Sequence, residues 1–160
     1  MKTYHLHSEL WLPEKRERVF KFFADPANLE RITPTWLRFV MVTDPAIRVT
    51  EGTLLDYRLK LHGFPLRWQS EITIWQPPYR FVDRQTKGPY SRWVHEHTFI
   101  DDGGGTLVRD DVEYAVLGRR LIQKLLVAPD LTRIFAYRQE ALRKIFNATG
   151  APTVVRSGLS

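Results

Sequence analysis

The stretch from residue 36 to residue 115 constrains the fold most, because runs of aromatic and β-branched residues alternate there with Pro, Gly and Asp turn signals. That pattern is typical of an antiparallel meander. We expect six strands in it, over residues 36–43, 53–62, 66–75, 79–86, 91–100 and 106–115. A further strand is predicted over residues 3–12, where the apolar side chains share one parity.

Helical patterns flank this meander on both sides. Pro13 opens a helix that runs to Asp25, and Asp25 with Pro26 caps a second short helix ending near residue 32. After Gly118 we expect helices over residues 119–128 and 130–147, divided by Pro129. The sequence therefore predicts one α+β domain over residues 1–148, with a seven-stranded antiparallel sheet, and a loose tail over residues 149–160.

Side-chain parity sorts the predicted strands into inward and outward faces. The strand over residues 91–100 alternates an aromatic and histidine set with a set that includes the formal charges, so we place the first set inside. The same rule applies to the other strands of the meander. The residues predicted to face inward and line a binding site are Tyr57, Leu59, Trp68, Phe81, Asp83, Gln85, Trp93, His95, His97, Asp110 and Tyr114, and Ser70, Ile72 and Ile74 are expected on the same face.

Arg138 falls within the apolar stripe of the last predicted helix, which includes Phe135. A guanidinium buried without a partner costs several kcal/mol, so we expect Arg138 to meet Asp83, Asp110 or an anionic ligand. The alternative is that Arg138 buries only its stem and reaches solvent at a cavity mouth. We predict that the inward polar residues and Arg138 form a polar patch in an aromatic cavity. A closed hydrogen-bond network without ligand contact is the structural alternative.

The pair His95 and His97 also has the spacing of metal ligands on a strand. The same spacing recurs at His5 and His7 without inward carboxylates, so the sequence alone favours no metal. Neither a Gly-x-Ser-x-Gly elbow nor a Gly-rich phosphate loop is present, and we expect no cofactor. The enzymatic hypothesis that remains is that His95 or His97, tuned by Asp83 or Asp110, acts as the general base in an aldol-type cyclisation or dehydration, with Arg138 polarising a carbonyl.

Composition narrows the class of protein further. The chain has no cysteine, which excludes disulfides and thiolate chemistry and fits the cytoplasm. Its start lacks the apolar core of a signal peptide, and no run is apolar enough to span a membrane. The net charge of +6 lies in residues 116–160, which hold 8 basic and 2 acidic side chains. Because the excess is confined to that segment, we expect no nucleic-acid partner.

Several local motifs resemble one family of known proteins. They are Leu12-Pro13, Val19 to Leu29, Thr33 to Trp36, Tyr57 to Gly63, Trp75 to Pro78, Gly88 to Tyr90, Trp93 to His97 and Phe135 to Arg138. Together with the element order, they resemble the START/Bet v 1-like (SRPBCC) superfamily, and within it the bacterial polyketide cyclase/dehydrase and coenzyme Q-binding branch. The resemblance implies the helix-grip fold, in which a curved sheet wraps round the long C-terminal helix, with a cavity between them.

The function expected from residues and resemblance together is binding or carriage of a hydrophobic small molecule, such as a lipid, quinone or polyketide-like compound. A cyclase or dehydrase that uses the same cavity is the alternative from the enzyme class. A third possibility is that the basic C-terminal helix docks on an acidic partner or a membrane surface. The sequence does not predict an oligomeric state.

Overall fold

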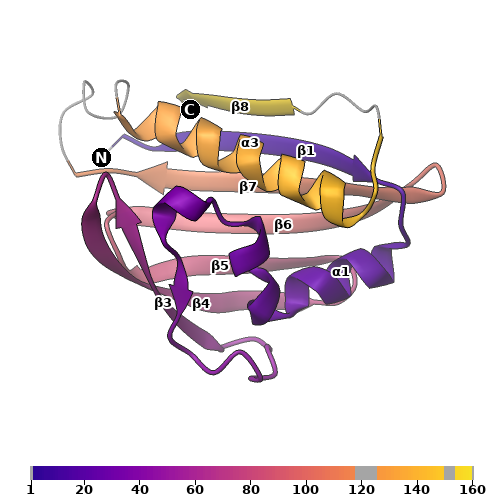
Figure 1. Ribbon diagram of the computed structural model, residues 1–160, viewed down its shortest axis with the longest axis horizontal. Coiled ribbons are helices and arrows are strands. Elements are labelled where there is room, and N and C mark those ends of the chain that lie inside the picture. Colours follow the sequence, from indigo (N-terminus) through magenta and orange to yellow (C-terminus); the bar gives the residue numbers. More distant parts are fainter. Residues whose placement is uncertain (1, 118–125, 150–153, 160) are drawn as a thin grey trace.

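A single eight-stranded antiparallel sheet organises the computed structural model, which describes residues 2–117, 126–149 and 154–159 (Figure 1). The spatial order is β2-β3-β4-β5-β6-β7-β1-β8. The meander from β2 to β7 is therefore continuous, and β1 lies next to β7. The strands are β1 (Tyr4–Leu12), β2 (Val40–Met41), β3 (Leu54–Leu61), β4 (Phe64–Gln76), β5 (Arg80–Lys87), β6 (Arg92–Asp102), β7 (Gly105–Ala115) and β8 (Val154–Leu159).

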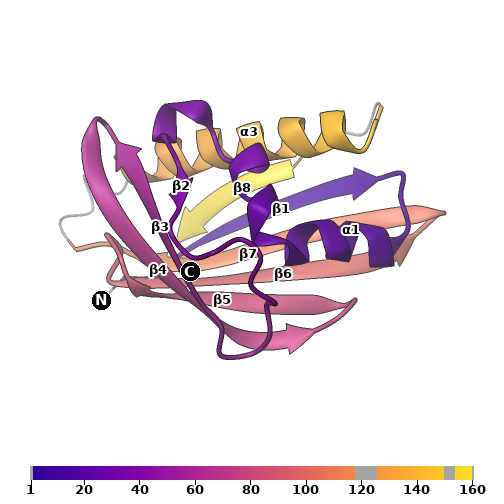
Figure 2. The same ribbon diagram turned by 60° about the horizontal axis from the view of Figure 1, so that its bottom comes forward.

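The helices lie on one face of this curved sheet. The long helix α3 (Ala128–Ile145) crosses that face lengthwise, and α1 (Arg16–Ala24) packs on the same side (Figure 2). The turns η1 (Pro26–Asn28), η2 (Glu30–Ile32) and η3 (Thr35–Leu37) follow α1. The Asp25 carboxylate accepts a hydrogen bond from the Ala27 N–H at 2.9 Å, which confirms the predicted cap. The predicted α+β helix-grip architecture is therefore confirmed, and the predicted helix over residues 119–128 lies largely outside the described residues.

The predicted strand over residues 36–43 is wrong in its first half. Residues 35–37 form the η3 turn, which ends at Arg38 with a φ of 45°. Val40 and Met41 pair with β3, and the Val42 and Thr43 N–H groups donate to the Asp56 carbonyl of the same strand. Trp36 lies outward on this turn, where its ring packs edge-on against Tyr137 of α3 at 5.4 Å. The aromatic run that suggested a strand thus belongs to a contact between this turn and α3.

The C-terminal tail was expected to be loose, and this expectation is wrong for its last part. Residues 154–159 form β8, which pairs antiparallel with β1 from Tyr4 opposite Leu159 to Glu9 opposite Val154. The reason is that β1 pairs with β7 on one side only, so its other edge would otherwise present unpaired backbone groups. This pairing joins residues far apart in the chain, which a local pattern does not reveal.

A β-bulge shifts the parity of β4. Its register with β5 changes between Ile72 and Ile74, after which Trp75 rather than Ile74 faces the helices. The prediction that Ile74 lines the inner face is therefore wrong, because the extra residue reverses the alternation beyond it. Trp75 instead packs against Phe20 of α1, with ring centroids 5.2 Å apart.

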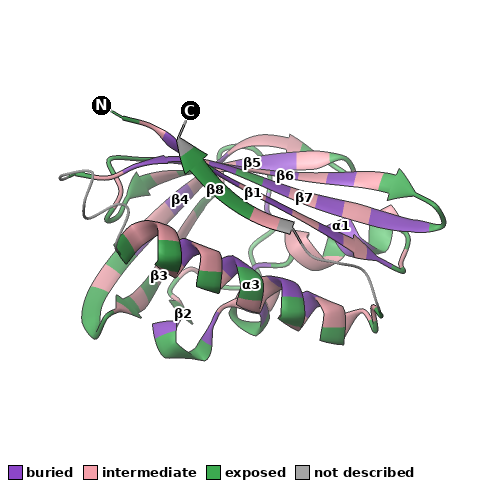
Figure 3. Cartoon of the chain, turned by 90° about the horizontal axis from the view of Figure 1, so that it is seen from above, coloured by how far each residue is buried: buried purple, intermediate pink, exposed green. Residues whose placement is uncertain are grey.

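The core fills the space between sheet and helices in two adjoining clusters. One surrounds Phe20, Phe99 and Leu142 where α1, β6 and the end of α3 meet. The other surrounds Tyr114 and Phe135 near the start of α3. Buried and less buried residues alternate along β1, β6 and β7, as the parity argument requires (Figure 3).

Candidate functional site

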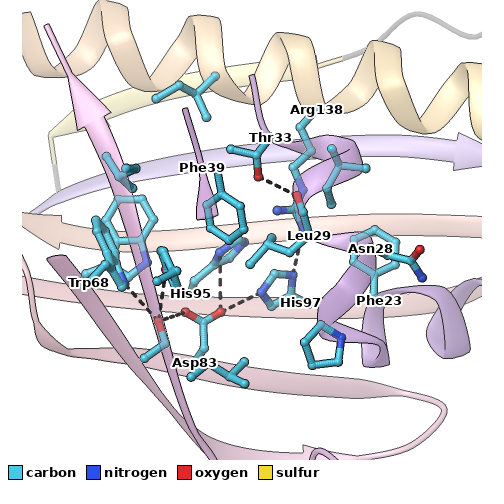
Figure 4. A pocket seen from close by; sticks show the side chains of 18 of the residues that line it. Phe23, Asn28, Leu29, Thr33, Phe39, Trp68, Asp83, His95, His97 and Arg138 are labelled. Carbon is cyan, nitrogen blue, oxygen red and sulfur yellow. Dashed lines mark hydrogen bonds and ion pairs between the residues drawn. The ribbon is translucent and has the colours of Figure 1, made fainter. Parts of the chain in front are cut away.

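A cavity of about 220 Å³ lies between the sheet and α3. Its walls come from β3, β4, β5, β6, α3 and the short helices after α1 (Figure 4). Most of the lining is aliphatic or aromatic. Ten of the thirteen predicted site residues line it: Tyr57, Leu59, Trp68, Phe81, Asp83, Trp93, His95, His97, Phe135 and Arg138.

The other three predicted residues lie outside the cavity wall. Gln85 holds the following turn, because its Nε2 donates to the Tyr90 carbonyl at 2.7 Å and its Oε1 accepts from the Tyr90 N–H at 3.2 Å. Tyr114 is completely buried and stacks on Tyr4. Asp110 lies behind the two histidines and reaches them from β7. Their predicted inward direction is right, but other side chains stand between them and the cavity.

Sequence reasoning missed several parts of the wall. The segment from α1 to η3 contributes residues that include Phe23, Asn28, Leu29 and Thr33, and the loop before β6 contributes Tyr90. The apolar periodicity of α1 identified a core helix, but it did not show that the turns after it bend over the open side of the sheet. Gln139 was also missed: this buried residue of α3 donates to Ser8 Oγ at 2.6 Å and fixes the helix to β1.

Four polar side chains converge where β5, β6 and β7 lie side by side. His95 Nε2 donates to Asp110 Oδ1 at 2.8 Å. His97 Nε2 donates to Asp83 Oδ2 at 2.9 Å, as Figure 4 shows. His97 Nδ1 lies 3.1 Å from Asp110 Oδ1, and the two imidazole rings, tilted by 30° to one another, have centroids 3.7 Å apart. The strand register explains this arrangement, since Asp83 is directly opposite His95 and His97 is directly opposite Asp110.

Arg138 completes the polar cluster from α3. Its Nη2 lies 3.7 Å from Asp110 Oδ1 and 3.4 Å from His97 Nδ1, and only 11% of its side chain is exposed. Because the Asp110 carboxylate is the nearer acceptor for the His97 Nδ1–H, we assign the guanidinium as the ion-pair partner of Asp110. The alternative in which Arg138 reaches solvent is thereby excluded, and Asp110 is the carboxylate that meets it. The Arg138 Nε is buried and has no hydrogen-bond partner among the described residues.

The surroundings separate the protonation behaviour of the two histidines. Burial and the neighbouring His97 lower the pKa of His95, and the hydrogen bond to Asp110 offsets this only in part. Burial also opposes the charge of His97, but its contacts with Asp110 and Asp83 raise its pKa above the ordinary value. We therefore assign His95 as neutral, with its proton on Nε2, and His97 as the site that shares a proton with two carboxylates.

The surroundings of both carboxylates in the cluster favour their ionised form. Burial acts to raise the pKa of Asp110, but the charge of Arg138 and the hydrogen bonds from the histidines hold that pKa well below its usual range. Burial likewise opposes ionisation of Asp83, yet the hydrogen bond from His97 and the nearby positive charges leave its pKa lowered. The cluster thus holds charged groups in a buried site, where electrostatic interactions are stronger than in water.

Ser70 links this cluster to the aromatic wall. Its hydroxyl accepts from the Trp68 indole N–H at 3.0 Å and donates to Asp83 Oδ1 at 3.4 Å. The Tyr57 hydroxyl lies 3.4 Å from Ser70 Oγ. Burial and, after it, the negative charge of Asp83 raise the pKa of Tyr57 far above its ordinary value. The arrangement can therefore present a neutral imidazole, a carboxylate and hydroxyl groups to a molecule in the cavity. Asp83, His95 and His97 are also the described residues that could hold a metal ion.

A curved antiparallel sheet that grips a long helix over an apolar cavity defines the Bet v 1-like class. The chain belongs to the family described as polyketide cyclase/dehydrase and lipid transport, whose model matches residues 12–143. No curated protein matches it. None of the described helices is long and apolar enough to cross a bilayer.

Solved structures show the same fold at low sequence identity. Protein CV1439 from Chromobacterium violaceum is 14% identical with a TM-score of 0.70, covering 93% of this chain and 100% of that one. Major latex-like protein 151 from Panax ginseng is 12% identical with a TM-score of 0.70, covering 92% and 100%. Norcoclaurine synthase from Thalictrum flavum, in complex with dopamine and hydroxybenzaldehyde, is 15% identical with a TM-score of 0.66, covering 94% and 90%.

Proposed function

We propose that the protein binds and carries a hydrophobic small molecule with a polar or anionic group, of the lipid, quinone or polyketide-like class. The cavity supports this proposal because its wall is mostly aliphatic and aromatic while its few polar groups are gathered at one place. Such a combination suits a ligand with an apolar body and one polar end. The family to which the chain belongs, which includes lipid transport, supports the same conclusion.

One observation bears most of this proposal. Arg138 lines the cavity, and its buried Nε has no hydrogen-bond partner among the residues that the structure describes. A guanidinium forms directed hydrogen bonds with carboxylate or phosphate oxygens. A buried donor that makes no hydrogen bond destabilises the protein. An acidic or strongly polar ligand group beside Arg138 would satisfy that donor. The polar end of the ligand then lies toward Leu29 and Thr33, which surround Arg138 in Figure 4.

A matched pair of probes tests this proposal: dansyl-labelled undecanoic acid and its uncharged methyl ester, titrated by fluorescence. We expect both to bind, and Arg138→Met to weaken binding of the acid by about 10-fold or more, since charge-assisted hydrogen bonds contribute about 1.5–3 kcal/mol. The ester should change by less than about 3-fold on the same scale. Arg133→Met is the control, because Arg133 lies on the exposed face of the same helix and packs over Trp36.

Two results would contradict the proposal. The first is that neither probe binds the wild-type protein. The second is that Arg138→Met and Arg133→Met weaken the acid equally, which would assign the effect to overall charge rather than to the cavity.

A second candidate function is a cyclase or dehydrase, and one observation favours it. His95 lines the cavity, Asp110 holds its Nε2–H, and burial lowers its pKa, so Nδ1 is the atom that can act as a base. In this case His95→Gln should abolish turnover of a cyclisable polyketide-like substrate while leaving its affinity within a few-fold. Equal loss of turnover and affinity would favour carriage alone.

We further propose that the protein acts in the cytoplasm, that its partner is the small-molecule ligand rather than nucleic acid, and that quinones are among the ligands to test first. The absence of cysteine supports the cytoplasm. The zero net charge of residues 1–115 supports a small-molecule partner rather than nucleic acid.

A further inference from the structure

The two faces of the polar cluster differ in how their hydrogen bonds are met. His95 uses its Nε2–H for Asp110, so its Nδ1 carries only a lone pair. That nitrogen faces Asp83 Oδ2 at 3.8 Å, beyond hydrogen-bond distance. His95 Nδ1 and Asp83 Oδ2 are thus two acceptor atoms that lie near one another in a buried site without a hydrogen bond between them.

His97 points its remaining nitrogen at the same carboxylate oxygen. Its Nε2 lies 2.9 Å from Asp83 Oδ2, and its Nδ1 faces Asp110. One ligand atom from each of Asp83, His95 and His97 thus lies within 4.8 Å of the others. Two ligands that each lie 2.0–2.2 Å from one ion, at angles of about 90–110°, are separated by about 2.8–3.6 Å. The contacts of 2.9 and 3.8 Å to Asp83 match that requirement to within a few tenths of an ångström.

Asp110 supplies the outer support that such a site needs. A metal-bound histidine usually donates its other ring N–H to a carboxylate, which fixes its tautomer and its orientation. Here one oxygen, Asp110 Oδ1, lies 2.8 Å from His95 Nε2 and 3.1 Å from His97 Nδ1. Both rings are therefore held with their second nitrogen, Nδ1 of His95 and Nε2 of His97, near Asp83. Arg138 in turn pairs with Asp110 and holds it in place.

Charge balance leaves room for a cation. Asp83 and Asp110 place two carboxyl groups beside one fixed positive group, Arg138. A cation bound by Asp83, His95 and His97 would meet the acceptor atoms that converge there. We propose that Asp83, His95 and His97 form a binding site for a divalent first-row transition metal, with Asp110 as its positioning residue. The ion replaces the proton between His97 and Asp83, and that proton leaves to solvent.

The donor set and its position indicate the class of ion and its role. Two imidazoles and one carboxylate suit Zn²⁺, Fe²⁺ and related ions rather than Mg²⁺ or Ca²⁺. All three ligands line the cavity while Asp110 lies behind them, so the coordination positions opposite the protein ligands face the cavity. An oxygen atom of a cavity ligand could fill such a position. The inference goes beyond the proposed carriage of a hydrophobic molecule and does not depend on it.

Titration of chelator-treated full-length protein with Co²⁺ and Zn²⁺ tests the proposal. We expect one ion per chain by calorimetry and visible Co²⁺ absorption bands of a site with nitrogen and oxygen ligands. Asp83→Asn should abolish the bands, and Asp110→Asn should weaken binding by about 10–100-fold while the bands persist, as expected for an outer-shell carboxylate. His7→Gln is the control, because His7 lies near Asp111 and Glu9 in a half-exposed group of one histidine and two carboxylates.

The proposal is overturned if no stoichiometric binding is measured, if Asp83→Asn binds as wild type, or if His7→Gln rather than Asp83→Asn removes the bands. Because a variant could lose metal binding by unfolding, a second measurement uses the wild-type protein alone. Co²⁺ added to the wild-type protein should broaden or shift the imidazole NMR signals of His95 and His97 before those of His5 and His7, and the reverse order would contradict the proposal.

Discussion

The contrast between Asp110 and its neighbour Asp111 tests the buried network most sharply. Asp110 accepts hydrogen bonds from both histidines and pairs with Arg138, whereas Asp111, one residue further along β7, is exposed and pairs with His7 at 2.6 Å. Replacing either by Asn keeps the shape of the side chain and removes its charge. The two variants therefore differ in burial and partners alone.

We expect Asp110→Asn to lower the free energy of unfolding by about 3 kcal/mol. Removing one partner of a buried pair costs about 3–5 kcal/mol, and the Asn oxygen still accepts one hydrogen bond, which places the effect at the low end. For a chain of this size, that corresponds to a fall in Tm of roughly 6–12 °C. Asp111→Asn should cost less than about 1 kcal/mol, as is usual for an exposed pair.

Urea unfolding followed by tryptophan fluorescence measures both values. The double variant Asp110→Asn with Arg138→Met should cost less than the sum of the single variants, because each removes the other's partner. If Asp110→Asn lies within about 1 kcal/mol of the wild type, or if the double variant is simply additive, the buried network described here is refuted.

Three further predictions concern the fold. Leu142→Ala should lower the free energy of unfolding by about 2–5 kcal/mol in urea, because Leu142 is almost fully buried on the inner face of α3, and a smaller loss would contradict its place in the core. Trp75→Ala should destabilise more than Ile74→Ala in the same assay, because the bulge turns Trp75 inward; the opposite order would restore the simple alternation. A chain ending at residue 149 should have a lower Tm and, by size-exclusion chromatography, should associate through the exposed edge of β1, and an unchanged monomer with unchanged Tm would show that β8 is dispensable.

The sequence was informative wherever the argument depended only on alternation. Trp93, His95, His97 and Phe99 are all buried, as their shared parity predicted, because successive side chains of an unbroken strand must point to opposite faces. The helical angle of Arg138 likewise placed it in the apolar stripe of α3. Both results follow from the geometry of one element and need no knowledge of the rest of the chain.

Parity failed where a strand departs from regular geometry or where contacts join distant segments. The bulge in β4 reverses the alternation after Ile72, and no residue in that stretch signals it. The pairing of β8 with β1 depends on a free edge in the folded sheet. Parity also could not distinguish residues that line the cavity, such as Asp83, from residues one layer behind, such as Asp110.

The metal hypothesis shows the same limit. Histidines two residues apart occur at both His5–His7 and His95–His97, and spacing alone cannot separate them. The difference lies in the register between strands, which brings Asp83 opposite His95 and Asp110 opposite His97. Three strands from separate parts of the sequence must be aligned before the donor atoms converge.

We propose that the cavity between the sheet and α3 binds an apolar molecule. A bulky side chain placed inside this cavity should therefore block binding. Leu59 lines the cavity from β3, and Lys60, the next residue, lies exposed on the other face. Titration of dansyl-labelled undecanoic acid into Leu59→Trp and Lys60→Trp compares the same substitution inside and outside. We predict that Leu59→Trp loses about 10-fold or more in affinity while Lys60→Trp binds as wild type, and equal binding by both variants would contradict the claim.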